Sequence, residues 1–275
     1  MTPKSLAQVA VRPFGRTITW TLFIAVLAAG SIGYFVSARL NPLLDKSVET
    51  LASQSQISGG KLDWRGQPYT LLAENGFLSL AVNVEGNASL GTADFRIEFQ
   101  RNNLLVGSFA GWLTIPYPEG YTIAFNREIV APKWGAWKSL LLVYLICDSA
   151  LLLILTWSLL GLGYGLIARA IATSLGRECS WGTAWKLSLL AQTIGALVLT
   201  SCILLYSAHR LSLLALGMAF AFHFAVAIFY VVLPPFWFRK VPIAAPTGEN
   251  PFAQETSESE STAAQKDNPF SSRAC

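Results

Sequence analysis

The stretch LLVYLICDSALLLILTW, residues Leu141 to Trp157, is apolar enough to cross a membrane, yet it contains one acidic residue, Asp148. A charge at bilayer depth costs at least ~2.5 kcal/mol on insertion scales, so it normally faces protein or water. The stretch therefore predicts a membrane-spanning helix in which Asp148 needs a polar contact.

The charge distribution along the chain predicts three further spans. The 275 residues are 53% hydrophobic and only 13% charged, against a usual charged share of about 25%. A helix of about 20 apolar residues crosses the ~30 Å hydrocarbon layer. Four nearly uncharged stretches reach that length, and they are residues 17–38, 140–167, 187–206 and 211–237.

The first span has an alternative interpretation as a cleaved signal peptide, with VSA at Val36–Ala38 as the cleavage site. The apolar core of a signal peptide is usually about 7–15 residues. Residues 17–38 are longer, so we expect an uncleaved anchor.

The basic residues near the span ends predict the orientation of the chain, because cytoplasmic loops carry an excess of Lys and Arg. Three basic groups fall on one side of four alternating helices, whereas the loop SAHR, residues 207–210, falls on the other. We therefore expect both termini in the cytoplasm and residues 39–138 outside. The three groups are Lys4, Arg12 and Arg16; Arg169, Arg177 and Lys186; and Arg239 and Lys240.

Residues 39–138 have the pattern of a β domain. GFLSLAVNVEG (76–86), DFRIEFQ (94–100) and YTIAFN (121–126) alternate with period two, which is typical of half-buried strands. We expect a small, mostly antiparallel sheet with one covered face, a turn at VEGNASLGT (84–92) and a helical stalk at LNPLLDKSVETLASQ (40–54). The predicted fold is a four-helix transmembrane bundle with this small mostly-β extramembrane domain inserted between helices 1 and 2.

The remaining segments are a cytoplasmic lead (1–16), a cytoplasmic loop (168–186) and a disordered tail (241–275). Trp181 and Trp185 in the loop would share one helical face at the membrane surface, so we expect an interfacial helix there. The tail is rich in Ser, Thr, Ala and acidic residues, with little to bury.

The composition argues against enzymes and cofactors. The outward domain has no histidine or cysteine, which excludes Ser-His-Asp and Cys-His centres within it. Its carboxylate Glu98, on the polar side of a strand, is expected to be solvated. We expect no catalytic site, no cofactor and no metal site, and no nucleic-acid partner because the chain has no Lys/Arg-rich block.

Asp148 has a candidate partner in His223. Tyr144 and Asp148 lie on one stripe of the second span, and His223 lies on the small-residue stripe of the fourth. The two residues would be ~13 Å and ~18 Å deep from the outer side. We interpret Asp148, His223 and Tyr144 as an intramembrane polar clasp; the alternative is a proton-linked or ligand-binding centre.

Small residues at helical spacing predict close helix packing. They also offer surfaces for other membrane proteins or for a second copy of the chain, beside the lipid bilayer itself. They are Ala25, Ala29 and Gly33; Gly161 and Gly165; and Ala215, Ala219 and Ala227.

The tail contains a short repeat, ENPFA (249–253) and DNPFS (267–271). Asn-Pro-Phe forms turns with an exposed aromatic ring, and it resembles the peptides that endocytic EH-domain adaptors bind in eukaryotes. The candidate linear motifs are Asn250, Pro251 and Phe252, and Asn268, Pro269 and Phe270; the alternative is an inert tail.

The lead KSLAQVAVRPFGRTITWTLF (4–23) and the stretch IARAIATSLGRECSWGTAWKLSLLA (167–191) resemble the Yip clan of membrane proteins, especially its bacterial branch. This resemblance implies a membrane organiser without catalytic residues, in a bacterial inner (plasma) membrane. The function expected is therefore a non-enzymatic membrane scaffold or sensor-like protein. The alternative is a small transporter or channel subunit that uses Asp148 and His223.

Overall fold

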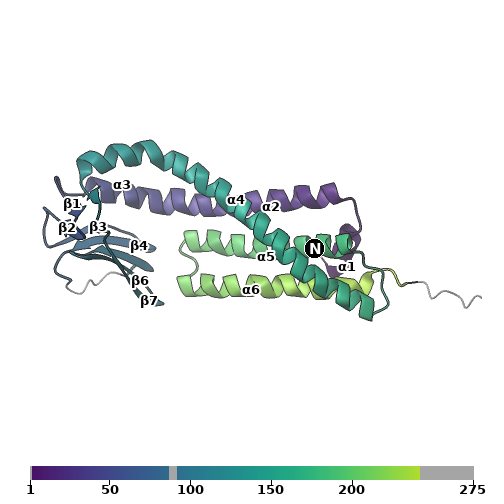
Figure 1. The fold of residues 1–275 in the computed structure, drawn as a ribbon. Helices are drawn as coiled ribbons and strands as arrows, with labels where there is room; N and C mark the ends of the chain where they lie inside the picture. Colours follow the sequence, from purple (N-terminus) through teal and green to yellow (C-terminus); the bar gives the residue numbers. More distant parts are fainter. Residues whose placement is uncertain (1, 87–91, 242–275) are drawn as a thin grey trace, which may run out of the picture. The chain divides into compact units, whose positions relative to one another are not determined.

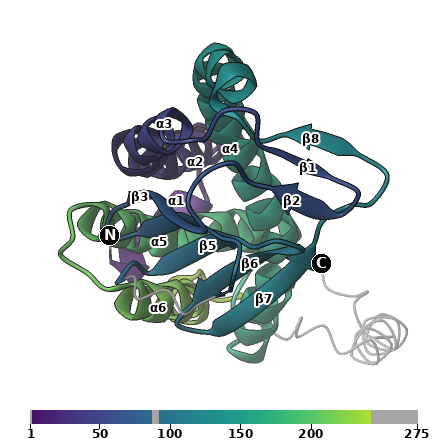
Figure 2. The same ribbon diagram turned by 90° about the vertical axis from the view of Figure 1, so that its left-hand side faces the viewer.

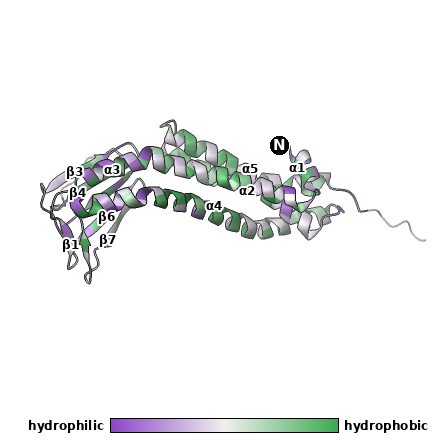
Figure 3. Cartoon of the chain, turned by 90° about the horizontal axis from the view of Figure 1, so that it is seen from above, coloured by the Kyte–Doolittle hydropathy of each residue, from purple (hydrophilic) through white to green (hydrophobic). Residues whose placement is uncertain are grey.

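The computed structural model describes residues 2–86 and 92–241. Four helices are long and apolar enough to cross a bilayer, with mean hydropathy between 1.9 and 2.3 over their apolar windows. Their middle parts are hydrophobic and the polar residues gather at both ends (Figure 3). These four helices, drawn in Figure 1, are α2 (Phe14–Phe35), α4 (Arg127–Ser174), α5 (Trp181–Ser207) and α6 (Leu213–Val232).

The first span continues without a break into the predicted stalk. The α2 helix passes through a π-helical segment, η1 (Val36–Leu40), into α3 (Asn41–Glu49). Of the expected stalk at residues 40–54, the part up to Glu49 is helical. The candidate cleavage site at Val36–Ala38 lies inside this continuous helical segment.

The helices α4 and α5 extend further than the predicted spans, and this corrects one expectation. The side chain of Asn126 caps α4 by accepting a hydrogen bond from the Ile129 N–H at 3.1 Å, and the Ser180 hydroxyl caps α5 in the same way through the Thr183 N–H. Only residues 175–180 separate the two helices. The loop predicted at residues 168–186 is therefore shorter than expected, because both helices continue into it. Trp181 and Trp185 are helical, as expected, and lie in the first turns of α5, which lead directly into the third predicted span. Their place at a membrane surface stays a prediction.

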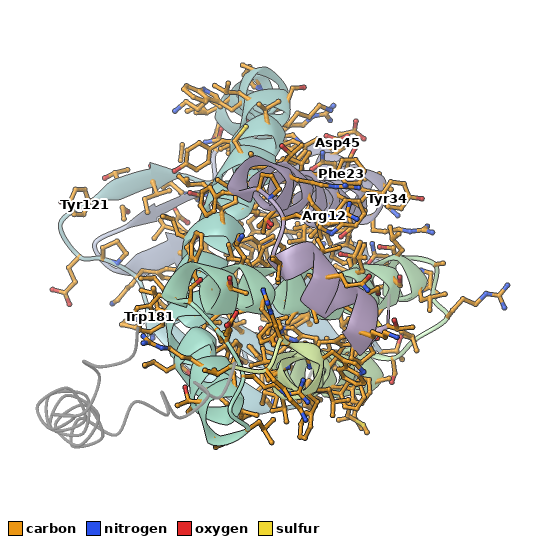
Figure 4. All side chains as sticks on the ribbon, turned by 90° about the vertical axis from the view of Figure 1, so that its right-hand side faces the viewer. Arg12, Phe23, Tyr34, Asp45, Tyr121 and Trp181 are labelled. Carbon is orange, nitrogen blue, oxygen red and sulfur yellow. The ribbon has the colours of Figure 1, made fainter. Side chains whose placement is uncertain are left out.

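The sequence analysis missed a short helix at the start of the chain, α1 (Pro3–Ala10). Thr2 and Ser5 form a reciprocal capping box, which satisfies backbone N–H groups at the helix start. Leu6 and Ala10 are fully buried against residues of α5. Figure 4 shows α1 from this end of the bundle, where Arg12 follows it and leads towards α2.

The helix α5 lies at the centre of the bundle, and small residues bring the other helices against it. Gly161 and Gly165 of α4 face Trp185 and Ala184, whereas an added Cβ at Gly195 would lie 2.6 Å from the carbonyl oxygen of His223 in α6. The small residues of these helices therefore pack inside one chain. The helix α4 crosses the others obliquely (Figure 1).

The strands lie between α3 and α4 in the chain and form two sheets (Figure 2). The three-stranded sheet has the order β2-β1-β8, and the five-stranded sheet has the order β3-β4-β5-β6-β7. The strands are β1 (Gln56–Ser58), β2 (Lys61–Asp63), β3 (Tyr69–Glu74), β4 (Leu78–Asn83), β5 (Phe95–Phe99), β6 (Asn103–Ser108), β7 (Gly111–Pro116) and β8 (Thr122–Ala124).

All strand pairs are antiparallel except β4 and β5, which are parallel. Parallel neighbours need a connection that returns along the sheet. At the start of the expected turn region, residues 84–92, Val84 and Glu85 form a turn in which the Gly86 N–H donates to the Asn83 carbonyl. Residues 87–91 within it lie outside the described part.

The strand β4 is buried on both faces, unlike the half-buried strand that its alternation predicts. Leu80 and Val82 enter a cluster that also contains Leu43 of α3 and Ile57 of β1. On the opposite face Asn83 is buried and its amide donates to the carboxylate of Glu98 at 3.1 Å. Glu98 is itself buried rather than solvated, so the expectation of one covered face is wrong for β4 and β5.

The end of the last span differs slightly from the prediction. The α6 helix ends at Val232, and a 3-10 turn, η2 (Pro234–Trp237), follows. Proline lacks the backbone N–H that a continuing helix needs, so Pro234 and Pro235 stop α6 here.

Candidate functional site

The strands meet the helices at an aromatic cluster that joins three distant parts of the chain. Phe77, just before β4, lies 5.1 Å from Phe35 of α2 and 4.8 Å from Tyr206 of α5, measured between ring centroids. The imidazole of His209, in the connection from α5 to α6, stacks on Phe77 at 4.2 Å. The contacts of Phe77 with Phe35 and Tyr206 are edge-on and the contact with His209 is stacked, and these are the geometries that aromatic pairs prefer. We call Phe35, Phe77, Tyr206 and His209 the junction cluster.

Hydrogen bonds surround the junction cluster. The Tyr206 hydroxyl donates to the Asp94 carboxylate at 2.7 Å. Arg39 of η1 donates through Nε to the Ser207 carbonyl at 2.8 Å, and its own carbonyl accepts from the Asn75 amide at 2.8 Å. Each bond connects a helix end to another helix or to the strands, so the position of each part depends on the others.

The backbone geometry at the junction requires specific residues. His209 has a positive φ of 55°, which is uncommon for a residue other than glycine. A Cβ added at Gly76 would lie 3.1 Å from the His209 ring, tighter than ordinary van der Waals contact. The short SAHR loop and Gly76 therefore fit against each other closely.

A second connection links the stalk to α4. The Asp45 carboxylate of α3 accepts from the Trp134 indole N–H at 2.7 Å and from the Lys138 ammonium at 3.1 Å. The helices that precede and follow the strands in the sequence are thereby joined near the strands.

A cleft of about 430 Å³ lies beside the junction cluster. Its lining comes from the five-stranded sheet and from the start of α6, and it is partly polar, with Asp94 and Arg96 on one side and Ser212 on the other. The indole ring of Trp112 also lines it and covers Gly107, where a Cβ would overlap the ring.

The structure does not bring the predicted intramembrane residues together. The Nδ1 atom of His223 lies against the Phe220 carbonyl of its own helix, and its ring contacts Phe220 and Phe224. In residues 2–86 and 92–241, no hydrogen bond or ion pair reaches Asp148. Neither Asp148 nor His223 lines the clefts beside Trp20, Trp112 and Tyr34. Tyr144 points its side chain away from the chain, with most of its surface exposed.

Other site predictions have a more limited outcome. The described residues contain no group of His, Cys, Asp or Glu that could hold a metal ion. The Asn-Pro-Phe repeats, Asn250–Phe252 and Asn268–Phe270, lie outside the described residues, so they stay predictions.

The sequence analysis missed the junction cluster. A histidine in a four-residue loop between two spans was a visible signal in SAHR, because such a loop has room for little besides polar turn residues. Nothing in the sequence pairs that histidine with Phe77, since the two positions are far apart in the chain.

Comparison with known families places the chain. A family model described as "Protein of unknown function (DUF1189)" matches residues 1–234. The chain belongs to the DUF1189 family. The DUF1189 match includes every helix from α1 to α6 and all eight strands of the described residues, and it ends before the tail. No curated protein and no solved structure matches the chain.

Proposed function

We propose that this DUF1189 protein is a non-enzymatic integral membrane scaffold or sensor-like protein, whose strand domain lies outside and is mechanically coupled to the transmembrane helices. One observation carries this proposal: the junction cluster and its hydrogen bonds join the ends of α2, α5 and the strands. A domain connected to the helices only by flexible linkers would need no such contacts. A force or a bound partner at the strands would therefore shift α2 and α5 directly.

The distribution of basic residues supports an orientation with both termini in the cytoplasm. Lys and Arg gather at the starts of α2 and α5 and at the end of α4, which is the end of the bundle opposite the strands. Such an excess is typical of cytoplasmic ends. On this proposal the membrane is a bacterial inner (plasma) membrane, as the Yip-clan resemblance implies.

The orientation is tested by protease protection. A tag in the exposed turn next to Tyr121 should be removed by a protease added to intact spheroplasts, while tags at either terminus should survive. The reverse pattern would overturn the proposed orientation.

The coupling is tested by hydrogen exchange of the protein in nanodiscs. Phe77→Ala removes the ring on which Phe35, Tyr206 and His209 pack, so amides in α5 should exchange faster as far as its first turns. The matched control is Phe109→Ala, which removes an exposed ring from the same sheet. Changes confined to the strands in the Phe77 variant would argue against transmission through the junction.

A transport assay separates this proposal from the alternative of a transporter or channel subunit. We expect no pH-driven flux in proteoliposomes. A flux that both Asp148→Asn and His223→Ala abolish would overturn the scaffold or sensor proposal in favour of the intramembrane centre.

A further inference from the structure

The outer face of α4 carries a carboxylate, the side chain of Asp148, within an apolar helix. Ile146 packs against α2, because an added Cβ at Gly33 would lie 2.5 Å from its side chain. At 3.6 residues per turn, Asp148 is rotated ~200° from Ile146 and so lies on the opposite side of the helix. Asp148 therefore points away from the other helices of its own chain.

The residues around Asp148 are apolar and open. Tyr144 is 67% exposed, Leu151 55% and Leu155 51%. With Asp148 between Tyr144 and Leu151, the four residues follow one another at the three- and four-residue spacing of a single helix face. None of the apolar window of α4 is buried within the chain, although its hydropathy is the highest of the four candidate spans. We call Tyr144, Asp148, Leu151 and Leu155 the outer α4 face.

Lipid hydrocarbon is an unfavourable environment for Asp148 on this face. Asp148 lies ten residues, ~15 Å along the helix, beyond Lys138, the last charged residue before it. At that depth a carboxylate in hydrocarbon is costly and normally faces protein or water. Since no residue in the described part of the chain pairs with Asp148, the partner must come from outside those residues.

We propose that the outer α4 face is a homodimer interface, in which two copies of the chain pair their α4 helices around a two-fold axis along the membrane normal. Copies inserted in the same orientation have parallel α4 helices, so Asp148 meets Asp148 of the second copy at equal depth. Each carboxyl group then gives the other the polar contact that lipid does not supply. An unrelated partner would need its own polar group at this depth, whereas a second copy supplies it automatically.

The outer α4 face also has the residue spacing of a helix–helix interface. Tyr144, Asp148, Leu151 and Leu155 repeat at spacings of four, three and four, which is the seam of a parallel helix pair. The small-residue faces of α2 and α4 cannot serve this purpose, because Ala25 and Ala29 of α2 and Gly161 of α4 are already buried inside the monomer. This inference rests on the proposed membrane insertion.

The test is cysteine cross-linking in native membranes. In a background without the four natural cysteines, Leu151→Cys places a thiol on the outer α4 face, and oxidation with copper phenanthroline should convert most of the chain to a disulfide-linked dimer. The matched control is Met218→Cys on α6, where the residue is 67% exposed against 55% for Leu151, and this variant should stay monomeric. Equal yields at the two positions, or an adduct with a protein of another mass at Leu151→Cys, would overturn the proposal.

Substitutions of Asp148 test its role in the same assay. Asp148→Asn keeps a donor and an acceptor, so the yield from Leu151→Cys should be unchanged. Asp148→Leu removes the polar contact, and the yield measured under dilution in lipid should fall about threefold to tenfold. An unchanged yield with Asp148→Leu would refute the polar pairing.

Carbonate extraction distinguishes the two levels of failure. A monomeric chain that stays in the membrane pellet would defeat the dimer alone. A chain released into the supernatant would defeat both the dimer and the proposed membrane function.

Discussion

The helices α4 and α5 have nearly the same hydropathy but opposite surroundings. Their apolar windows have mean hydropathies of 2.3 and 2.0, yet none of the α4 window and 56% of the α5 window is buried inside the chain. Hydrophobicity alone therefore does not decide which helix forms the centre of this bundle. This is expected in a bilayer, because lipid tails are as apolar as leucine and exert no preference for burying it.

Small and polar residues distinguish the central helix. Ser188 and Thr193 of α5 are buried and donate to carbonyls of their own helix, while Gln192 donates to the Trp157 carbonyl of α4 at 3.0 Å. Gly195 permits a close approach of the α6 backbone, because an added Cβ would lie 2.6 Å from the His223 carbonyl oxygen. In contrast, the outward positions of α4 are mainly leucines, which suit lipid or the face of another helix.

The largest loss of stability is expected for the substitution Gly195→Ala. Gly195→Ala places a Cβ 2.6 Å from the His223 carbonyl oxygen, and a backbone atom cannot move aside cheaply. We expect a loss of about 1–3 kcal/mol, the usual cost of overpacking, measured as the free energy of unfolding in mild detergent. Gly163→Ala on α4 meets no atom within 4 Å and should be neutral or slightly stabilising, because alanine favours helices. Equal losses in the two variants would contradict the contrast between α4 and α5.

The second largest loss of stability is expected when a buried leucine of α5 is replaced, and an exposed leucine of α4 gives the comparison. Leu187 of α5 is 0% exposed and Leu159 of α4 is 68% exposed. Leu187→Ala leaves a cavity and should cost about 2 kcal/mol, below the usual range for water-soluble cores because the transfer to lipid contributes little. Leu159→Ala should cost less than about 0.5 kcal/mol. The comparison requires the same detergent and the same unfolding assay, and a larger loss for Leu159→Ala would indicate that α4 is covered even in detergent.

The sequence predicted the four helices and three of the strands well, because hydrophobic length and period-two alternation are local properties. It did not predict which helix lies at the centre or where Asp148 points, since those depend on the crossing angle of α4. The contact of Phe77 with Tyr206 and His209 could not be predicted from the sequence either. It joins positions more than a hundred residues apart, and no short motif records it. Glu98 illustrates the same limit: its alternation was read correctly, but the burial of both sheet faces is a tertiary property.

A smaller effect should follow from loss of the Tyr206 hydroxyl. Tyr206→Phe removes the hydrogen bond to the Asp94 carboxylate, and bonds to charged groups contribute about 1.5–3 kcal/mol. Since the Asp94 side chain can regain water, we expect the lower end of that range, read as a decrease in unfolding free energy. Tyr144→Phe on the outer α4 face is the control and should change the stability of the monomer by less than about 0.5 kcal/mol. A neutral Tyr206→Phe would show that the aromatic contacts and the hydrogen bonds of Arg39 hold the junction without the bond to Asp94.

The smallest change in stability near neutral pH is expected for a tyrosine of the strand domain. Two tyrosines, one buried and one exposed, allow the same comparison there. Tyr117 is 9% exposed and donates to the Gln100 carbonyl at 3.0 Å, whereas Tyr121 is 71% exposed. Burial raises the pKa of the Tyr117 hydroxyl above its ordinary value of about 10. Because the folded state then holds its proton more tightly than the unfolded state, this contribution to stability is complete below about pH 10 and is lost as the pH rises further. Thermal melting between pH 8 and 11 should therefore decline more steeply in the wild type than in Tyr117→Phe, while Tyr121→Phe should follow the wild type. Parallel curves for all three proteins would show that Tyr117 ionises as freely in the folded domain as in water, and the burial of this corner of the sheet would need revision.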